Sequence, residues 1–145
     1  TGFTNNEPIQ LQLAGIPTTS LHVDQVLALP GPGLIAGTKI LANDRVGVHA
    51  FIAATLRAMN EIAADPQKGL DASITFVPEV ATAKDVQLAI LNATIATWKS
   101  SNAASTGYGW IDTEGWKASI AYMTTLHLVP KPVTVDQLVD PGLLP

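Results

Sequence analysis

The sequence predicts an α/β protein that is rich in helix, or more closely the late, helix-rich part of such a protein. Apolar residues recur at helical spacing in several long segments. Only two or three short segments have a strand-like pattern, whereas an ordinary sheet has roughly four to six strands. Hydrophobic residues make up 47% and charged residues 14% of the 145 residues. This is a globular composition with enough apolar material for a core.

The first predicted element is a short helix from Ile9 to Ala14. Pro8 fits its first turn, because the N–H that proline lacks is not needed there, and Gly15 with Pro17 ends the helix. Glu7 stands at the N-terminus, where the helix dipole favours a carboxylate. From these residues alone, a capped helix start and a ligand-contacting polar cluster explain the opening turn equally well.

Three short segments are strand candidates. Ser20 to Val26 alternates imperfectly between apolar and polar residues, and Leu34 to Leu41 is a short apolar run. Leu70 to Val77 is ambiguous between a helical turn and a strand. Leu29-Pro30-Gly31-Pro32-Gly33 cannot sit comfortably inside a helix or a central strand, and therefore predicts a connector.

The longest predicted helix begins at an Asp44 cap and ends at Asp65-Pro66. Its apolar positions follow helical spacing and predict one buried stripe along the helix. The stripe consists of Val48, Ile52, Thr55, Met59 and Ile62, widened by Phe51, Leu56 and Ala63.

Two further helices show the same periodicity. The first of them buries Leu88, Leu91, Ile95 and Trp98. After a polar loop over residues 100–109, an Asp112 cap begins the other helix, which buries Trp116, Ile120, Met123 and, at its end, His127. A capping box from Thr134 to Gln137 predicts one last short turn.

Charge and cysteine content exclude several classes of function. The net charge is −4 and the eight Lys and Arg residues do not cluster, so nucleic acid and anionic membrane surfaces are poor candidate partners. No cysteine is present, which excludes disulfides, thiolate nucleophiles and cysteine-based metal sites. No apolar run approaches the ~18 residues of a membrane span. The chain opens at Thr1 without a leader, so any targeting segment is expected to be removed or to lie outside this sequence.

The sequence offers no catalytic or metal-binding motif. The three histidines, His22, His49 and His127, have no partner at metal-ligand spacing. No serine lies in a GxSxG elbow, and Gly31-Pro32-Gly33 lacks the third glycine of a dinucleotide loop. We therefore predict no catalytic residue, no metal and no cofactor. Tyr108 and Trp110, at the end of the polar loop, are secondary candidates for stacking on a flat ligand.

One series of features extends along nearly the whole chain. It begins with Thr4-Asn5-Asn6-Glu7-Pro8-Ile9-Gln10-Leu11 and Leu13-Ala14-Gly15-Ile16. It continues through the connector to Gly33-Leu34-Ile35-Ala36, then through the long helix, and ends at Gly109-Trp110-Ile111-Asp112 with Trp116 beyond. In order and spacing, this series resembles the C-terminal half of the nitrate/sulfonate/taurine and thiamine-pyrimidine (riboflavin-like) group of periplasmic substrate-binding proteins of ABC importers.

This resemblance implies a two-lobed, hinged periplasmic-binding-protein fold of type II. Residues 1–30 would end the second lobe and carry a ligand-facing turn, residues 31–41 would be the hinge return strand, and residues 42–145 would be the helical part of the first lobe. The expected partners are a small-molecule ligand, an ABC permease in the membrane and the N-terminal half of the same protein. The expected location is periplasmic or extracellular, and a lipid anchor would lie on a segment absent from this sequence.

The resemblance also places the Asn-Glu-Pro turn at the ligand. The predicted ligand-binding residues are Asn6 and Glu7, with Asn5 as an additional asparagine, and Thr4 is a secondary candidate beside Tyr108 and Trp110. Glu7 can accept from ring N–H or amino groups, and Asn6 offers a donor and an acceptor. Because a bare anion would match Glu7 poorly, we expect a neutral or amino-bearing heteroaromatic ligand, such as a pyrimidine or a flavin-like compound.

Three alternatives stand beside this interpretation. One is a binding protein for sulfonate or nitrate. Another is the eukaryotic-type pyrimidine synthase of thiamine biosynthesis, an enzyme of the same fold that carries a cysteine-rich motif near the position of residues 29–33. The absence of cysteine argues against this enzyme, and we expect a protein that is not an enzyme. The third is a stand-alone interaction domain, and nothing in the sequence supports it.

Overall fold

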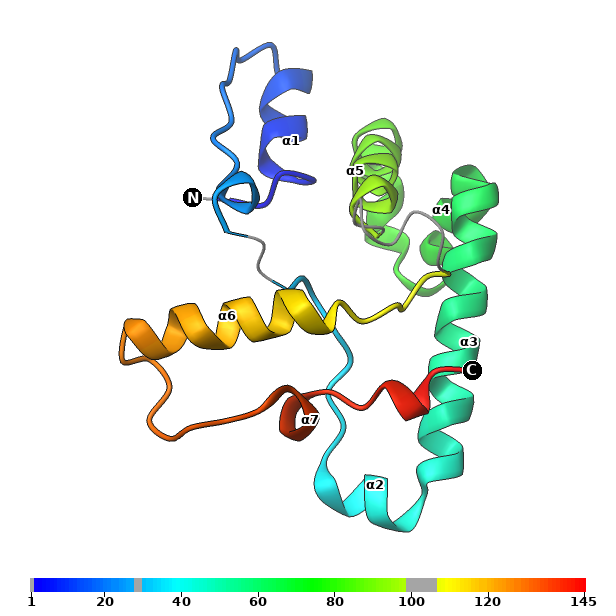
Figure 1. The fold of residues 1–145 in the computed structure, drawn as a ribbon. Helices are drawn as coiled ribbons and strands as arrows, with labels where there is room; N and C mark the ends of the chain where they lie inside the picture. Colours follow the sequence, from blue (N-terminus) through cyan, green and yellow to red (C-terminus); the bar gives the residue numbers. More distant parts are fainter. Residues whose placement is uncertain (1, 28–29, 99–106) are drawn as a thin grey trace. The chain divides into compact units, whose positions relative to one another are not determined.

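The computed structural model describes residues 2–27, 30–98 and 107–145. Within these ranges every regular element is a helix, and no strand occurs (Figure 1). The described residues form two compact units, one drawn from residues 1–21 and 56–104 and the other from residues 22–55 and 105–145. Leu29 of the predicted connector and residues 100–106 of the predicted polar loop lie outside the described ranges.

The first unit is built on contacts of the helix α5 with its neighbours. Helix α4 packs against α5 and against the 3-10 helix η2, and α1 also packs against α5 (Figure 1). Leu70 of α4 is the buried hydrophobic residue of this unit, with 4% of its surface exposed. The bounds of these elements are α1 Glu7–Leu13, α4 Pro66–Phe76, η2 Pro78–Ala83 and α5 Lys84–Thr97.

The second unit joins α6 to the C-terminal segment. Helix α6 contacts α7, and the buried residues are Ser119 of α6, Val135 of α7 and Leu143 of η4. The elements are η1 Val23–Gln25, α2 Thr38–Asn43, α6 Thr113–Thr125, α7 Val135–Leu138 and η4 Pro141–Leu143. Helix α3, Arg45–Ala64, contributes its first part to this unit and its last part to the first unit.

The predicted long helix and its stripe agree with the structure. Asp44 Oδ1 accepts a hydrogen bond from Gly47 N–H at 2.9 Å and so caps α3. The stripe residues are half-buried, whereas Phe51, which was predicted to widen the stripe, is 63% exposed. The Phe51 prediction was wrong because helical spacing gives the face of a residue but not what covers that face.

The predicted caps of α6 and α7 are also confirmed. Asp112 Oδ1 accepts from Gly115 N–H at 3.0 Å at the start of α6, and Gln137 Oε1 accepts from Thr134 N–H at 3.0 Å in the capping box of α7. The predicted buried stripe of α5 is half-buried throughout. On α6, by contrast, Met123 and His127 are exposed, so that part of the predicted face was wrong.

None of the three strand candidates forms a strand. Residues 23–25 form the turn η1, and the segment from Leu34 to Leu41 runs without a partner until α2 begins at Thr38. A strand needs a neighbouring strand to receive its hydrogen bonds, and within the described residues this segment has none, with Ile35 99% exposed.

The ambiguous segment after Asp65 is helical for a local reason. Asp65 Oδ1 accepts from Lys68 N–H at 3.0 Å, and Pro66 occupies the first turn, so the start of α4 is both capped and pre-organised. Gly69 permits close packing, because an added Cβ would lie 3.0 Å from Cγ1 of Ile62. The segment therefore forms the helix α4 and not the alternative strand.

The helix-rich character of the predicted fold class is confirmed, whereas the strands of an α/β class are absent from the described residues. The predicted segments 1–30, 31–41 and 42–145 concern the lobes of a larger protein, which the two compact units of this chain do not test. The assignment of those segments to two lobes and a hinge stays a prediction.

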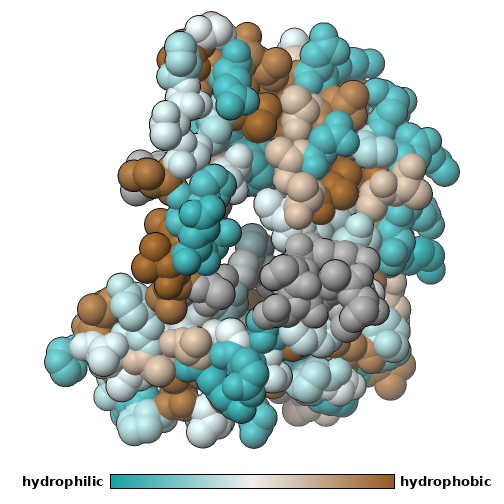
Figure 2. Space-filling model, turned by 45° about the horizontal axis from the view of Figure 1, so that its top comes forward, coloured by the Kyte–Doolittle hydropathy of each residue, from teal (hydrophilic) through white to brown (hydrophobic). Residues whose placement is uncertain are grey.

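Large apolar side chains reach the surface in both units. Buried hydrophobic residues among the described ones number three, Leu70, Val135 and Leu143. Figure 2 shows apolar residues, coloured brown, on the visible face between hydrophilic ones. Exposed large hydrophobic residues include Leu21, Val26, Ile35, Val46, Phe76 and Leu128. Few buried apolar contacts imply low stability for each unit, because apolar burial is the main force that stabilises a fold.

Helix α1 ends as predicted, at a glycine with left-handed backbone. Gly15 has a φ of +75°. Its N–H donates to Gln12 O at 3.0 Å, and the next N–H, of Ile16, donates to Leu11 O at 2.9 Å. This pair of bonds is a Schellman motif, which satisfies carbonyls that the helix end leaves without partners.

Helix α6 ends in the same motif but with histidine in the left-handed position. His127 has a φ of +56°, and its N–H donates to Thr124 O at 3.0 Å. The following N–H, of Leu128, donates to Met123 O at 3.0 Å. A side chain in this backbone region costs about 1–2 kcal/mol, because Cβ crowds the following carbonyl oxygen.

The two helix ends give opposite expectations for substitution. His127→Gly should raise the free energy of unfolding by about 1 kcal/mol, because glycine removes the crowding at Cβ. Gly15→Ala should lower it by about 1–2 kcal/mol for the converse reason. Urea unfolding of both variants measures these changes. The same sign of change in both variants would contradict the assignment of the two motifs.

An ion pair joins the start of α3 to the C-terminal segment within the second unit. Arg45 Nη1 lies 2.8 Å from Asp140 Oδ2, and Asp140 Oδ1 accepts from Gly142 N–H at 3.1 Å. The hydrogen bond from the Arg45 guanidinium lowers the pKa of Asp140, and its charge acts in the same direction. The carboxylate correspondingly raises the pKa of Arg45.

This ion pair predicts a pH dependence of stability. The pKa of Asp140 is lower in the folded than in the unfolded state, so the stabilisation is present above the ordinary pKa of 3.8 and is lost as pH falls through the lowered value. In the parent chain, the urea midpoint should fall as the pH is lowered through this range. In the Asp140→Asn variant, and equally in the Arg45→Gln variant, it should fall less steeply. If both variants keep the full slope of the parent chain, the pair does not contribute.

Candidate functional site

The predicted ligand-facing turn is held by backbone bonds and by Glu7. Asn6 N–H donates to Phe3 O at 3.0 Å, which closes the turn, and Phe3 N–H donates to Glu7 Oε2 at 2.7 Å. The carboxylate is thus folded back over the start of the chain, where a Cβ added at Gly2 would lie 2.7 Å from Glu7 Oε2. Glu7 is exposed, and a carboxylate retains acceptor capacity after one such bond.

Asn6 occupies the N-cap position of α1 but does not cap it with its side chain. Its φ of −126° and ψ of −79° lie outside the extended region that a capping side chain uses. Asn6 Oδ1 instead accepts from Gln10 Nε2 at 2.7 Å, one turn further along. The capped helix start, one of the two explanations of the opening turn, therefore has no side-chain cap at Asn6, whose side chain lies along α1.

Asn5 connects the opening turn to α5. Its Nδ2 donates to Thr94 Oγ1 at 2.8 Å in a partly buried contact, and Thr94 Oγ1 donates in turn to Ile90 O at 2.8 Å. This contact is part of the packing of α1 against α5. Asn5 thus has a structural bond that sequence reasoning missed, because the bond joins residues that are far apart in the chain.

A hollow of about 370–430 Å³ lies in each unit, and the one of the first unit contains predicted site residues. Of these residues Thr4 and Glu7 line it, whereas Asn5 and Asn6 do not. The hollow has a volume of ≈ 430 Å³, within the ~300–1,000 Å³ range of small-molecule sites. Its lining consists of Gly2, Phe3, Thr4, Glu7, Pro8, Leu11, Thr18, Thr19, Ser20 and Leu21.

The lining combines apolar walls, hydroxyl groups and one charge. Phe3, Pro8, Leu11 and Leu21 supply apolar surface, and Glu7 supplies a carboxylate. No Lys, Arg or His is among the lining residues, so this wall carries a net negative charge. The carboxylate of Glu7 can accept hydrogen bonds from a ligand that lies on these apolar side chains. The same carboxylate would repel an anion.

Sequence reasoning missed the hydroxyl residues of this hollow. Thr18, Thr19 and Ser20 follow the end of α1, and the chain there returns to the opening turn. The only signal was a run of three hydroxyl side chains after Pro17. That run has no periodicity, and its last residue was assigned to a strand that does not form.

Tyr108 and Trp110 belong to the second unit. They stand around Gly109, which has a φ of +85° in a turn before α6. Tyr108 is half-buried and Trp110 is 40% exposed. A role for these aromatic residues beside the ligand stays a prediction.

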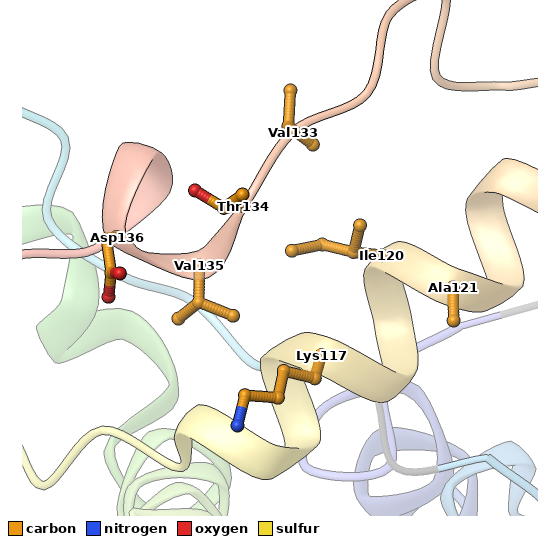
Figure 3. Close-up of a pocket in the computed structure, with 7 residues that line it drawn as sticks. All are labelled: Lys117, Ile120, Ala121, Val133, Thr134, Val135 and Asp136. Atoms are coloured by element: carbon orange, nitrogen blue, oxygen red, sulfur yellow. The ribbon is translucent and has the colours of Figure 1, made fainter.

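The second hollow, of ≈ 370 Å³, lies between α6 and residues 133–136, which include the start of α7 (Figure 3). Lys117, Ile120 and Ala121 line it from α6, and residues 133–136 line it from the other side. Lys117 Nζ lies 2.7 Å from Glu114 Oε1, and this bond raises the pKa of Lys117. The ammonium is thus paired within α6, and no predicted site residue lies in this hollow.

In the described part of the chain, no three His, Cys, Asp or Glu side chains gather as a metal site would require. No helix in that part is long and apolar enough to cross a bilayer.

A known protein family matches the N-terminal part of the chain. Residues 1–69 match the family described as NMT1/THI5 like, and this match includes the whole lining of the first hollow. The predicted resemblance is confirmed. Along 94% of its length the chain is also similar to the riboflavin-binding protein RibY of Chloroflexus aurantiacus, with 28% identity over 137 residues.

The similarity to RibY covers only part of that protein. The chain spans 39% of the length of the relative. No solved structure matches the chain. Membership of this substrate-binding group is thus supported by a family match over residues 1–69 and by similarity to one binding protein along nearly the whole chain.

Proposed function

We propose that this chain is part of the solute-binding protein of an ABC importer, and that it contributes one wall of a site for a small heteroaromatic molecule. The observation that carries the proposal is the hollow of the first unit, where Glu7 presents a carboxylate beside the apolar side chains of Phe3, Pro8 and Leu11. Family membership and the similarity to a riboflavin-binding protein support a binding role.

The ligand chemistry follows from the lining. A ring N–H or amino group can donate to Glu7 while the ring lies on the apolar side chains. A neutral or amino-bearing heteroaromatic compound, of pyrimidine or flavin type, satisfies both conditions. Asn6 stands beside this wall with its carbonyl oxygen bonded to Gln10 and its amide group as a further donor.

A sulfonate- or nitrate-binding protein is the alternative within the same group. Its anionic solute would need cationic or N–H donors, and the lining of the hollow offers one carboxylate and no cationic side chain. The pyrimidine synthase alternative would need its cysteine motif, and these 145 residues contain no cysteine. Both observations favour a heteroaromatic binder that is not an enzyme.

Calorimetric titration of the full-length protein tests this function. Three probes separate the alternatives: riboflavin, the pyrimidine half of thiamine, and taurine as the sulfonate. We expect heat of binding with one of the two heteroaromatic probes and none with taurine. Binding of taurine alone would overturn the heteroaromatic proposal in favour of the sulfonate alternative.

The isolated 145-residue chain should bind the same probe much more weakly than the full-length protein. Its hollow is partly open to solvent, and its units bury few hydrophobic residues, so we expect a site that is neither complete nor rigidly held. Titration of both proteins under the same conditions measures the difference. Equal affinity would contradict the view that this chain supplies only one wall of the site.

We further propose a periplasmic or extracellular location and an ABC permease as the membrane partner. Two lobes hinged near residues 31–41, with the N-terminal half completing the cleft, belong to the same proposal. These features follow from the resemblance, and fusion of a reporter to the full-length protein would locate it. A cytosolic reporter signal alone would contradict the proposed location.

A further inference from the structure

Thr18 has a feature that distinguishes it from the other hydroxyl residues of the first hollow. Its Oγ1 is buried and has no hydrogen-bond partner, the only side-chain oxygen or nitrogen of this kind within residues 2–27, 30–98 and 107–145. Thr18 nevertheless lines the hollow that also contains Thr4 and Glu7. A buried hydroxyl without a partner therefore lies at the wall of the proposed ligand site.

An unpaired buried hydroxyl destabilises the protein that contains it. Its bonds to water are lost on folding, and no protein group replaces them. Valine has nearly the same shape as threonine and would remove this cost. The hydroxyl of Thr18 thus weakens the unliganded fold, and native proteins seldom leave such a group without a partner.

A change of side-chain rotamer can give this hydroxyl a partner. Rotation about χ1 by one staggered step moves Oγ1 to another of the three staggered positions around Cβ, without movement of the backbone. Because Thr18 is only half-buried and lines the hollow, part of the residue already faces that space.

We propose that Thr18 is a ligand-contacting residue whose hydroxyl turns toward the hollow and hydrogen-bonds the solute beside Glu7. This inference rests on the proposed function. A carboxylate only accepts, whereas a hydroxyl can also donate, so the pair recognises a ring edge on which an N–H or amino group stands next to an acceptor. Such an edge is present in pyrimidines and in the pyrimidine part of flavins, and absent from sulfonates.

The test uses the full-length protein, with riboflavin and the thiamine pyrimidine as probes. Thr18→Val should raise the Kd of the bound probe roughly two- to tenfold, the loss expected for one hydrogen bond. The same variant should raise the urea midpoint without ligand, because the unpaired hydroxyl is gone. Thr18→Ser should keep nearly the parent affinity. Thr75→Val, on α4 and outside the hollow, is the matched control and should leave the Kd unchanged.

Each other outcome overturns the inference. If Thr18→Val leaves the Kd unchanged while Glu7→Ala raises it, the proposed function is retained and Thr18 does not contact the ligand. If Thr18→Val lowers the urea midpoint with an unchanged Kd, the hydroxyl serves the fold through a bound water. If the parent protein binds neither probe, the proposed function fails, and the role of Thr18 fails with it.

Discussion

Glu7→Ala is expected to raise the Kd of the full-length protein for its heteroaromatic solute roughly ten- to a hundredfold, the range for loss of a hydrogen bond to a charged group. The expectation follows from the place of Glu7, whose carboxylate is the one charge in the lining of the hollow. Calorimetric titration measures the change, and an unchanged Kd would remove Glu7 from the site.

Two further variants separate binding from folding in this experiment. Glu7 Oε2 also accepts from Phe3 N–H at 2.7 Å, so the alanine variant loosens the opening turn as well. Glu7→Gln keeps an oxygen acceptor for that N–H and removes the charge, and should therefore raise the Kd without loosening the turn. Glu61→Ala removes an exposed carboxylate of α3 outside the hollow and should leave the Kd unchanged.

Leu70→Ala is expected to cost about 2–5 kcal/mol of the free energy of unfolding, as for other large-to-small substitutions in a core. A loss of this size approaches the total stability of a small domain, so the first unit should unfold. The reason is that Leu70 is the one buried hydrophobic residue that the structure describes in that unit. Helical content of the 145-residue chain, measured by circular dichroism in urea, checks this result.

The same helix provides the control for Leu70. Phe76 of α4 is 86% exposed, and Phe76→Ala should change the free energy of unfolding of the chain by no more than about 0.5 kcal/mol. Leu70→Val is the milder core variant and keeps the result measurable if the alanine variant does not fold. Equal losses for Leu70→Ala and Phe76→Ala would mean that α4 is not packed as described.

Much of the helical structure could be predicted from local sequence signals. Asp44, Asp112 and Thr134 cap helices as their positions indicated, because capping depends on residues within a single turn. The predicted stripe of α3 was also correct, because it depends on local periodicity. The predictions that Phe51 and Met123 are buried were wrong, because distant segments decide which face of a helix is covered.

The strands could not be predicted correctly from alternation alone. Leu34 to Leu41 is apolar enough for a strand, but a strand exists only where another strand accepts its hydrogen bonds. No such partner lies within the described residues, and the segment instead leads into α2. The strands were therefore the least accurate part of the sequence prediction, whereas its helix-rich character was correct.

The candidate site was predictable in one part and not in another. Glu7 and Thr4 stood in a turn that the residues and the resemblance both indicated, and they line the hollow. The bond from Asn5 to Thr94 and the approach of Thr18 to the opening turn depend on tertiary structure, which no local pattern contains. The Asn6 side chain bonds Gln10 because the backbone at Asn6 lies outside the extended region.

Mass spectrometry of the small molecules that the full-length protein retains on native purification tests the proposed ligand class most directly. We expect a neutral or amino-bearing heteroaromatic compound, of pyrimidine or flavin type, that is lost from the Glu7→Ala variant. A sulfonate or another anion retained in its place, and retained equally by that variant, would overturn the proposed ligand class.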